Sequence, residues 1–202
     1  MIEWNEQQRM IQGMVRDFVQ KEVVPQLDDI EYNGVPPYDL LRKMIKTFGM
    51  DVMAKQNFDK QIAREKAAAA GEPQEEKKKK DGPSAAAGEQ AAMTMIPIIE
   101  LCRHAQGLVT AMGVSMGLTG GAIMSKGTTE QKERWALPLL TLEKVGAWAI
   151  SEPNSGSDAF GQMKTLAKRD GEGGYIINGS KTWITNGPDA NTYVIYAKTD
   201  LE

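Results

Sequence analysis

The residues whose types and spacing best suit chemistry lie in a loop that follows a predicted strand. The strand is expected over residues 145–150, and the run Ser-Glu-Pro-Asn-Ser-Gly-Ser-Asp fills residues 151–158. Hydroxyls and free backbone N–H groups in such a loop can hold an anion or the polar edge of a heterocycle, and Gly156 lets a ligand approach the backbone closely. A strand-ending turn with local Asp and Ser hydrogen bonds explains the same composition, so the residues alone leave both interpretations open.

The sequence offers few residues for other kinds of catalytic site or for a metal site. The chain has one cysteine, Cys102, and one histidine, His104, whereas a Cys/His zinc site needs about four ligands. We therefore expect no metal site of that kind, and a Ser-His-Asp triad is disfavoured because His104 lies in a helical-looking stretch. Glu152 and Asp158 flank a Pro-Asn-Ser-Gly turn without a defined mutual geometry, so structural or solvated roles are favoured over acid–base work.

The composition is that of an ordinary globular protein. The 202 residues are 41% hydrophobic and 25% charged, with a net charge of -3, which is typical of soluble domains. The run Lys77 to Lys80 has acidic neighbours, so no nucleic-acid partner is expected. No signal peptide is recognised, and no stretch approaches the roughly twenty apolar residues of a membrane span. We expect a cytoplasmic protein without a membrane span.

Helical periodicity dominates the first two thirds of the chain. An amphipathic helix is predicted over residues 5–23, with Pro25 at its end, and a second over 38–47, with Gly49 as its stop. A further helical stretch over 98–125 is rich in glycine and methionine.

Two details of the later helices carry predictions of their own. Met112, Met116 and Met124 are expected mainly in the core. Thr128 and Gln131 form the capping box of the next helix.

Residues 59–90 differ from their surroundings. They are rich in alanine, glycine, proline, lysine and glutamate, and Ile62 is their only large aliphatic residue. Such a segment buries too little apolar surface to offset its ordering entropy. We expect a flexible, charged insertion, although the stretch 64–70 has the propensity to extend a helix.

The periodicity changes to that of strands near residue 145. Besides the strand over 145–150, a hairpin is predicted over 175–185 around Asn178-Gly179, and a last strand over 192–197. The chain therefore reads as α+β: an all-α helical domain at 1–144, followed by an antiparallel β domain at 145–202.

A second run, Lys-Thr-Trp-Ile-Thr-Asn-Gly, fills residues 181–187. Together with Ala-Ile-Ser-Glu-Pro-Asn-Ser-Gly-Ser-Asp-Ala-Phe-Gly at 149–161, it resembles the flavin-binding signature of the acyl-CoA dehydrogenase family. The Gly-Thr-Thr-Glu-Gln-Lys-Glu-Arg-Trp segment from Gly127 and the order of helices before strands are similar to that family as well. The resemblance extends over nearly all of the chain except residues 59–90.

The resemblance implies FAD as the cofactor. By that resemblance, Ser151 bonds the flavin ring, the pair Gly156-Ser157 approaches the pyrophosphate, and Ser157 also faces the CoA part of the substrate. Trp183 flanks the isoalloxazine and Thr185 bonds near its N5 atom. The complete implied set is Trp148, Ile150, Ser151, Gly156, Ser157, Trp183, Ile184 and Thr185. From the residues alone, tryptophans such as Trp148 and Trp183 are expected in the core.

The reaction implied by the resemblance is α,β-dehydrogenation of an acyl-CoA thioester, with electrons passing to an electron-transfer flavoprotein, as in fatty acid β-oxidation. In that family the base is a glutamate, usually on a C-terminal helical bundle that these 202 residues do not contain. We therefore assign no catalytic base and expect the N-terminal half of such an enzyme, inactive alone and a homo-oligomer (tetramer or dimer) when complete. An acyl-CoA oxidase, a flavin monooxygenase of the same fold and a non-catalytic scaffold are the alternatives.

Overall fold

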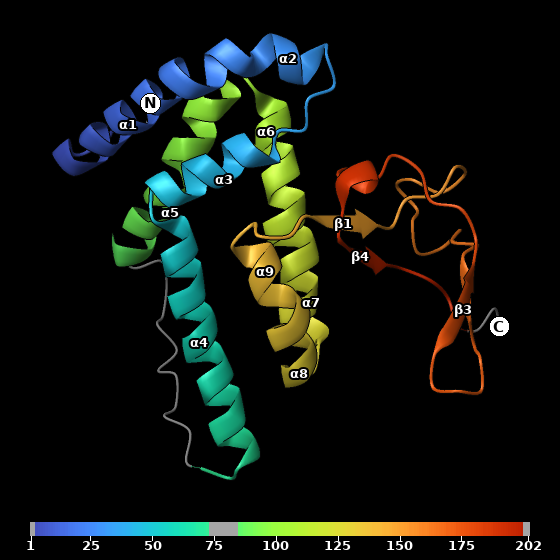
Figure 1. Cartoon of the computed structure of the whole chain (residues 1–202). Coiled ribbons are helices and arrows are strands. Elements are labelled where there is room, and N and C mark those ends of the chain that lie inside the picture. Colours follow the sequence, from blue (N-terminus) through green and yellow to red (C-terminus); the bar gives the residue numbers. More distant parts are fainter. Residues whose placement is uncertain (1–2, 73–84, 200–202) are drawn as a thin grey trace. The chain divides into compact units, whose positions relative to one another are not determined.

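The computed structural model describes residues 3–72 and 85–199 (Figure 1). The chain divides into two compact units, Met1–Met112 and Gly113–Glu202, and each is described by itself. The second unit takes in helices between residues 113 and 140 together with the strands. The domain boundary at 144/145 stays a prediction.

The first unit opens with the predicted amphipathic helix, α1 (Glu6–Phe18). Asn5 and Gln8 cap it reciprocally, because each side chain accepts a hydrogen bond from the other's backbone N–H, at 2.8 and 3.0 Å. The predicted end at Pro25 is wrong. Helical backbone continues through a π-helical turn, η1 (Val19–Val23), and a 3₁₀ turn, η2 (Val24–Gln26), into α2 (Leu27–Glu31). Pro25 is tolerated because it lies in the first turn of η2, where its missing N–H is not needed.

Two helices follow the loop at 33–37. Helix α3 (Tyr38–Thr47) has the predicted bounds and buries Leu41 and Ile45. Gly49 adopts φ +64°, a left-handed conformation that glycine takes without steric cost. It ends the turn after α3 and begins α4 (Met50–Ala69), so it joins two helices.

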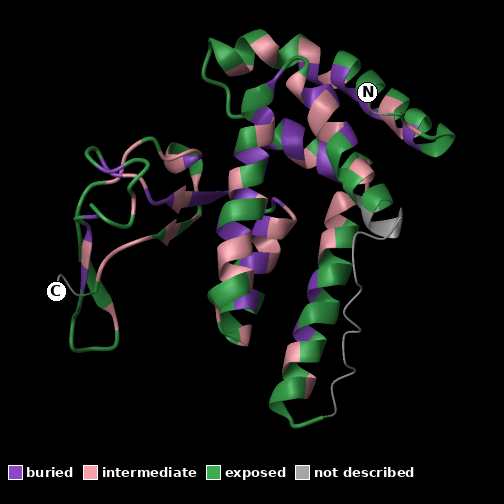
Figure 2. Cartoon of the chain, turned by 180° about the vertical axis from the view of Figure 1, so that it is seen from behind, coloured by how far each residue is buried: buried purple, intermediate pink, exposed green. Residues whose placement is uncertain are grey.

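The segment at 59–90, predicted to be a flexible charged insertion, is helical over much of its described length, and its flexibility stays a prediction. Helix α4 continues to Ala69, and α5 (Ala85–Cys102) begins at Ala85. Most of α4 is exposed (Figure 2), but Phe58 and Ile62, one turn apart, are buried. The burial of these two side chains and the helix propensity of the alanine-rich sequence both favour a helix here. The run Lys77 to Lys80 lies outside the described residues.

Helices α1 and α5 pack together around a buried carboxylate. Glu100 is 1% exposed and accepts hydrogen bonds from Gln12 Nε2 at 2.8 Å and Arg16 Nε at 2.9 Å, with Arg103 Nε at 3.2 Å. The hydrogen bond from Arg16 is the main reason why the pKa of Glu100 is lowered, against the effect of burial. The pairing satisfies a charge that would otherwise be costly to bury.

The helical stretch predicted over 98–125 is interrupted. Helix α5 ends at Cys102, and α6 (Gln106–Met112) begins after a short break. Helical backbone then runs from Gln106 to Lys126, and this stretch is long and apolar enough to cross a membrane, with a mean hydropathy of 1.4. The expectation that no stretch reaches that length is therefore wrong, although a core helix of a soluble protein has the same character.

The helices of the second unit pack closely on its first strand. A π-helical segment, η3 (Gly113–Gly120), leads into α7 (Gly121–Lys126). Strand β1 (Gly146–Ala149) lies against η3, where the backbone N–H of Gly146 donates to Ser115 Oγ at 2.9 Å. A Cβ at Gly146 would come within 2.8 Å of the Thr119 side chain, so this approach requires glycine.

Three short helical segments complete the helical part: α8 (Thr129–Gln131), η4 (Lys132–Ala136) and α9 (Leu137–Leu140). The predicted capping box of Thr128 and Gln131 is confirmed. Of the three methionines expected in the core, Met112 is buried, whereas Met116 and Met124 are half-buried.

The strands pair differently from the prediction. Strand β1 pairs in parallel with β4 (Thr192–Ile195), and β2 (Leu166–Arg169) pairs antiparallel with β3 (Tyr175–Asn178). The α+β class is confirmed, but the expectation of a purely antiparallel sheet is wrong for β1 and β4. A short 3₁₀ turn, η5 (Gly187–Asp189), precedes β4.

The hairpin predicted around Asn178-Gly179 is wrong. The turn lies instead at 170–174, where Asp170 Oδ1 accepts from the N–H groups of Glu172 and Gly174, each at 2.8 Å. Residues 180–185 form no strand in the described part of the chain. Gly179 (φ +154°) is needed for another reason, because a Cβ there would collide with Thr165.

Replacing Ile62 by alanine should lower the free energy of unfolding by about 2–4 kcal/mol, because it removes a buried side chain from α4. The exposed change Lys60→Ala on the same helix should stay within about 0.5 kcal/mol. Urea unfolding followed by circular dichroism measures both. Equally small effects would mean that residues 59–69 are the solvated segment expected from composition.

Candidate functional site: two motif loops joined by hydrogen bonds

The structure brings the two motif segments, 149–161 and 181–187, into direct contact within the second unit. The backbone N–H of Thr182 donates to the carbonyl of Ser151 at 3.0 Å. Lys181 Nζ donates to the carbonyl of Ile150 at 3.0 Å and to Glu152 Oε1 at 2.9 Å. Residues that lie about thirty positions apart in the sequence thus form one loop cluster.

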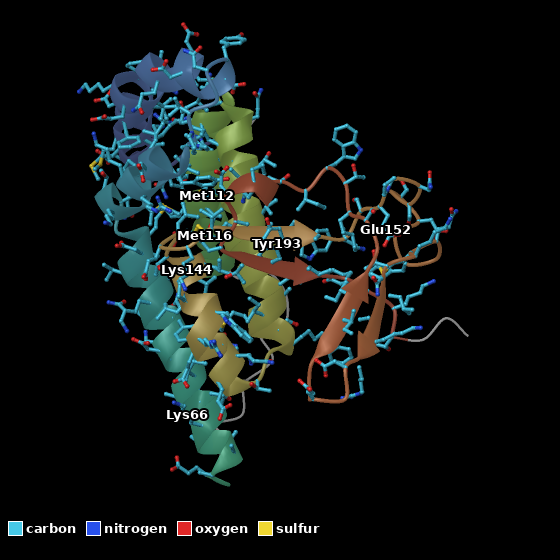
Figure 3. All side chains as sticks on the ribbon, turned by 45° about the vertical axis from the view of Figure 1, so that its right-hand side comes forward. Lys66, Met112, Met116, Lys144, Glu152 and Tyr193 are labelled. Carbon is cyan, nitrogen blue, oxygen red and sulfur yellow. The ribbon has the colours of Figure 1, made fainter. Side chains whose placement is uncertain are left out.

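Glu152 is the buried acidic group of this cluster (Figure 3). Besides Lys181, it accepts hydrogen bonds from the backbone N–H groups of Lys164, at 2.7 Å, and Thr165, at 2.9 Å. Burial alone would raise the pKa of Glu152, but the hydrogen bonds from Thr165, Lys164 and Lys181 outweigh it and lower the pKa to about 2. Glu152 is therefore an ionised structural group at neutral pH and a weak base.

The first loop is a closed turn with an exposed tip. Glu152 and Ser155 exchange two backbone hydrogen bonds of 3.0 Å, and Ser155 Oγ donates to the Asp158 carbonyl at 2.8 Å. The tip residues Gly156 and Ser157 are exposed, and a Cβ at Gly156 would meet nothing within 4 Å. A ligand can therefore approach the backbone of the loop tip without a steric obstacle.

The second loop is anchored at both ends and presents Trp183 between them. Asn186 is buried, has φ +66°, and donates from Nδ2 to the Gly146 carbonyl at 2.9 Å. Trp183 has φ +56° and is 91% exposed, so its expected place in the core is wrong. Thr185 and Ile184 are half-buried.

The remaining predicted site residues lie at the end of β1. Trp148 is half-buried, makes an edge-to-face contact with Tyr196 at 5.4 Å and donates from Nε1 to its hydroxyl at 3.3 Å. Phe160 contacts the same tyrosine ring at 6.0 Å. Ile150 is buried, so it offers a ligand little beyond its backbone.

Three hydroxyls at the cluster remain available to a ligand. Within residues 3–72 and 85–199, the side chains of Ser151, Ser157 and Thr185 make no hydrogen bond. Hydroxyls can donate as well as accept, and Trp183 adds an exposed aromatic surface. The cluster can therefore bind a flat heterocycle through polar edge contacts and stacking.

Sequence reasoning missed two residues that build the cluster, Lys181 and Asn186. Both lie in the second motif, but their partners lie 29 to 40 residues away in the sequence. The local pattern carries no signal for such distant pairing.

A cavity of about 470 Å³ in the second unit is lined by none of the three motif hydroxyls. It is mostly apolar, and Tyr196 connects it to the aromatic contacts of Trp148. The cavity is lined by Ala122, Ile123, Lys126, Gly127, Gln131, Trp135 and residues 192–196. The chemically versatile groups lie at the motif loops, so we place the candidate site there rather than in this cavity.

Comparison with known proteins identifies the family to which this chain belongs. Family models of the acyl-CoA dehydrogenase N-terminal domain and middle domain match residues 5–56 and 147–202, respectively. The short-chain specific acyl-CoA dehydrogenase of Clostridium acetobutylicum is 31% identical over 194 residues, which cover 96% of this chain and 44% of that protein. The caffeyl-CoA reductase-Etf complex subunit CarC of Acetobacterium woodii is 32% identical over 200 residues, covering 98% and 45%.

Solved structures agree with the sequence relatives. A glutaryl-CoA dehydrogenase from Mycobacterium smegmatis in complex with FADH2 is 26% identical, with a TM-score of 0.67. The match covers 98% of this chain and 44% of that one. The chain belongs to the acyl-CoA dehydrogenase family, and it spans less than half the length of these relatives.

Replacing Glu152 by glutamine should lower the free energy of unfolding by about 2–3 kcal/mol at pH 7. The pKa of Glu152 is lowered in the folded state from 4.5 to about 2. Its contribution is therefore fully present above pH 4.5 and is lost as the pH falls towards 2. Urea unfolding of the parent protein and of Glu152→Gln from pH 7 to pH 2 measures the difference between their free energies of unfolding. This difference should narrow as the pH falls.

The exposed Glu172 serves as the control for this pH series. Glu172→Gln should follow the parent protein at each pH. A constant difference between parent and Glu152→Gln from pH 7 to pH 2 would contradict the ionised, hydrogen-bonded state of Glu152.

Proposed function

We propose that this chain is the FAD-binding part of an enzyme that dehydrogenates an acyl-CoA thioester between its α and β carbons. The contact between the two motif segments carries the proposal, because it gathers unpaired hydroxyls and an exposed tryptophan into one cluster. The relative solved with FADH2 supports FAD as the cofactor. When bound, FAD supplies the acceptor for the hydride that leaves the β carbon.

The protein groups would act by holding and polarising the flavin. The hydroxyls of Ser151 and Thr185 would donate to its ring, where they would stabilise the negative charge that develops on reduction. Trp183 would offer its aromatic surface to the ring. The open backbone at Gly156 and the exposed Ser157 would receive the pyrophosphate, and Ser157 would also meet the CoA portion of the substrate.

The base that removes the α-proton is not assigned to the motif cluster. Glu152 is its buried carboxylate, but both of its oxygens already accept hydrogen bonds, and a pKa of about 2 makes it a poor proton acceptor. The base therefore comes from elsewhere in the complete enzyme. The relative from a reductase-Etf complex supports an electron-transfer flavoprotein as the redox partner.

A related flavin enzyme that reacts with oxygen is the second candidate function. An acyl-CoA oxidase or a flavin monooxygenase would use the same cofactor cluster, and rapid reoxidation of its reduced flavin by air would distinguish it. A non-catalytic scaffold would bind no flavin.

A homo-oligomeric complete enzyme and a cytoplasmic location are further parts of the proposal.

The purified 202-residue chain should retain flavin absorption bands after incubation with FAD and desalting. Ser151→Ala and Thr185→Ala should each weaken FAD binding by about three- to tenfold, as the loss of one hydrogen bond implies. Their melting temperatures should stay close to that of the parent, because neither hydroxyl bonds another described residue. Fluorescence titration with FAD measures the affinity.

Ser125→Ala on the exposed side of α7 is the matched serine control and should bind FAD like the parent. If the double variant of Ser151 and Thr185 retained the parental affinity, those hydroxyls would not hold the flavin. A parent chain that never turns yellow would favour the scaffold.

A further inference from the structure

Lys181 contributes side-chain hydrogen bonds to the contact between the two motif segments, yet the flavin-binding role proposed above does not use it. Its ammonium group donates to the carbonyl of Ile150 and to the carboxylate of Glu152, at 3.0 and 2.9 Å. Ser151 lies between these two acceptors, and its own carbonyl accepts from Thr182 N–H at 3.0 Å. Ile150, Ser151 and Glu152 of the first segment are thus hydrogen-bonded to Lys181 and Thr182 of the second.

Glu152 extends this constraint to the rest of the first loop. The same carboxylate accepts from the N–H groups of Lys164 and Thr165, which precede β2, and the Glu152 backbone closes the turn with Ser155. The side chains of Glu152 and Lys181 are 6% and 11% exposed. Loss of Lys181 would leave a buried carboxylate without its cation, which is costly.

Stability alone does not account for a lysine at this position. A buried ion pair can often be replaced by apolar side chains of similar volume without loss of stability. An apolar side chain at 181, however, cannot donate to the Ile150 carbonyl. The bond that aligns the backbone on one side of Ser151 therefore requires a cationic or amide donor, and arginine would supply one.

We propose that Lys181 is a positioning residue that fixes the Ser151 hydroxyl relative to the segment carrying Trp183 and Thr185. It acts through Ile150 and Glu152, the two residues to which its ammonium group donates. Its consequence for flavin binding rests on the function proposed above. Its local effect, the protection of the Thr182 N–H, does not.

The local effect is tested on the 202-residue chain without flavin, by amide hydrogen exchange resolved by NMR. In Lys181→Met, exchange of the Thr182 amide should become about tenfold faster, as the loss of a hydrogen bond implies. Lys181→Arg should restore the parental rate. The amides of the β2–β3 hairpin should keep their rates in both variants.

Lys198→Met is the matched control, because Lys198 Nζ also donates to a backbone carbonyl, that of Gly161, at 3.2 Å. It should leave Thr182 unchanged. Two results would overturn the proposal: a Thr182 amide that exchanges at the parental rate in Lys181→Met, or a uniform acceleration that includes β2 and β3. The second result would mean that Lys181 stabilises the second unit as a whole and does not position Ser151.

The cofactor consequence is measured separately, by fluorescence titration of each variant with FAD. Lys181→Met should weaken FAD binding about tenfold or more, since small misplacements of binding groups are costly, whereas Lys181→Arg and Lys198→Met should bind like the parent. Parental affinity in Lys181→Met would overturn the positioning role. If the parent chain binds no FAD but the Thr182 amide exchanges faster in Lys181→Met, the proposed function is contradicted and the local role of Lys181 stands.

Discussion

The requirement to satisfy one buried charge determines how the loops of the second unit meet. Glu152 carries a carboxylate into a loop region with little regular structure, and an unpaired charge there would cost several kcal/mol. Its donors come from separate parts of the chain: the N–H groups of Lys164 and Thr165 before β2, and the ammonium of Lys181 after β3. Because these groups must converge on two oxygen atoms, the loops that carry them have few alternative arrangements. The lowered pKa of Glu152 reflects the same convergence.

The first unit satisfies a buried carboxylate with different donors. Glu100 lies within α5, where the backbone N–H groups are engaged in the helix, so side chains must supply its partners. Gln12 and Arg16 of α1 do so, and the pairing joins two helices. Around Glu152, by contrast, the loop backbone has free N–H groups, and two of the donors are main-chain atoms. A main-chain donor also fixes the path of the chain, and this makes the arrangement at Glu152 suited to holding a site in shape.

The sequence predicts several features that depend on neighbouring residues, but it misses the pairings between distant ones. Helix α3 and the capping box at Thr128 arise from local spacing, and both are confirmed. The hairpin predicted around Gly179 is wrong because the chain turns at 170–174 instead, and because Gly179 serves a close approach to Thr165 rather than a turn. Parallel pairing of β1 with β4 and the reach of Lys181 to Ile150, 31 residues away, leave no local trace. Resemblance to a known family indicates the motif residues, but it does not predict the hydrogen bonds that join the two segments.

Trp183 adopts an unfavourable conformation that the anchored ends of its loop maintain. A large apolar side chain that is 91% exposed gains little from the hydrophobic effect, and a non-glycine residue at φ +56° adds strain of about 1–3 kcal/mol. Such a conformation persists only where its neighbours over-determine it. Thr182 on one side bonds Ser151, and Asn186 on the other bonds Gly146. The described residues therefore hold an aromatic surface in the open without covering it, which is the arrangement that a flat ligand stacked on Trp183 would use.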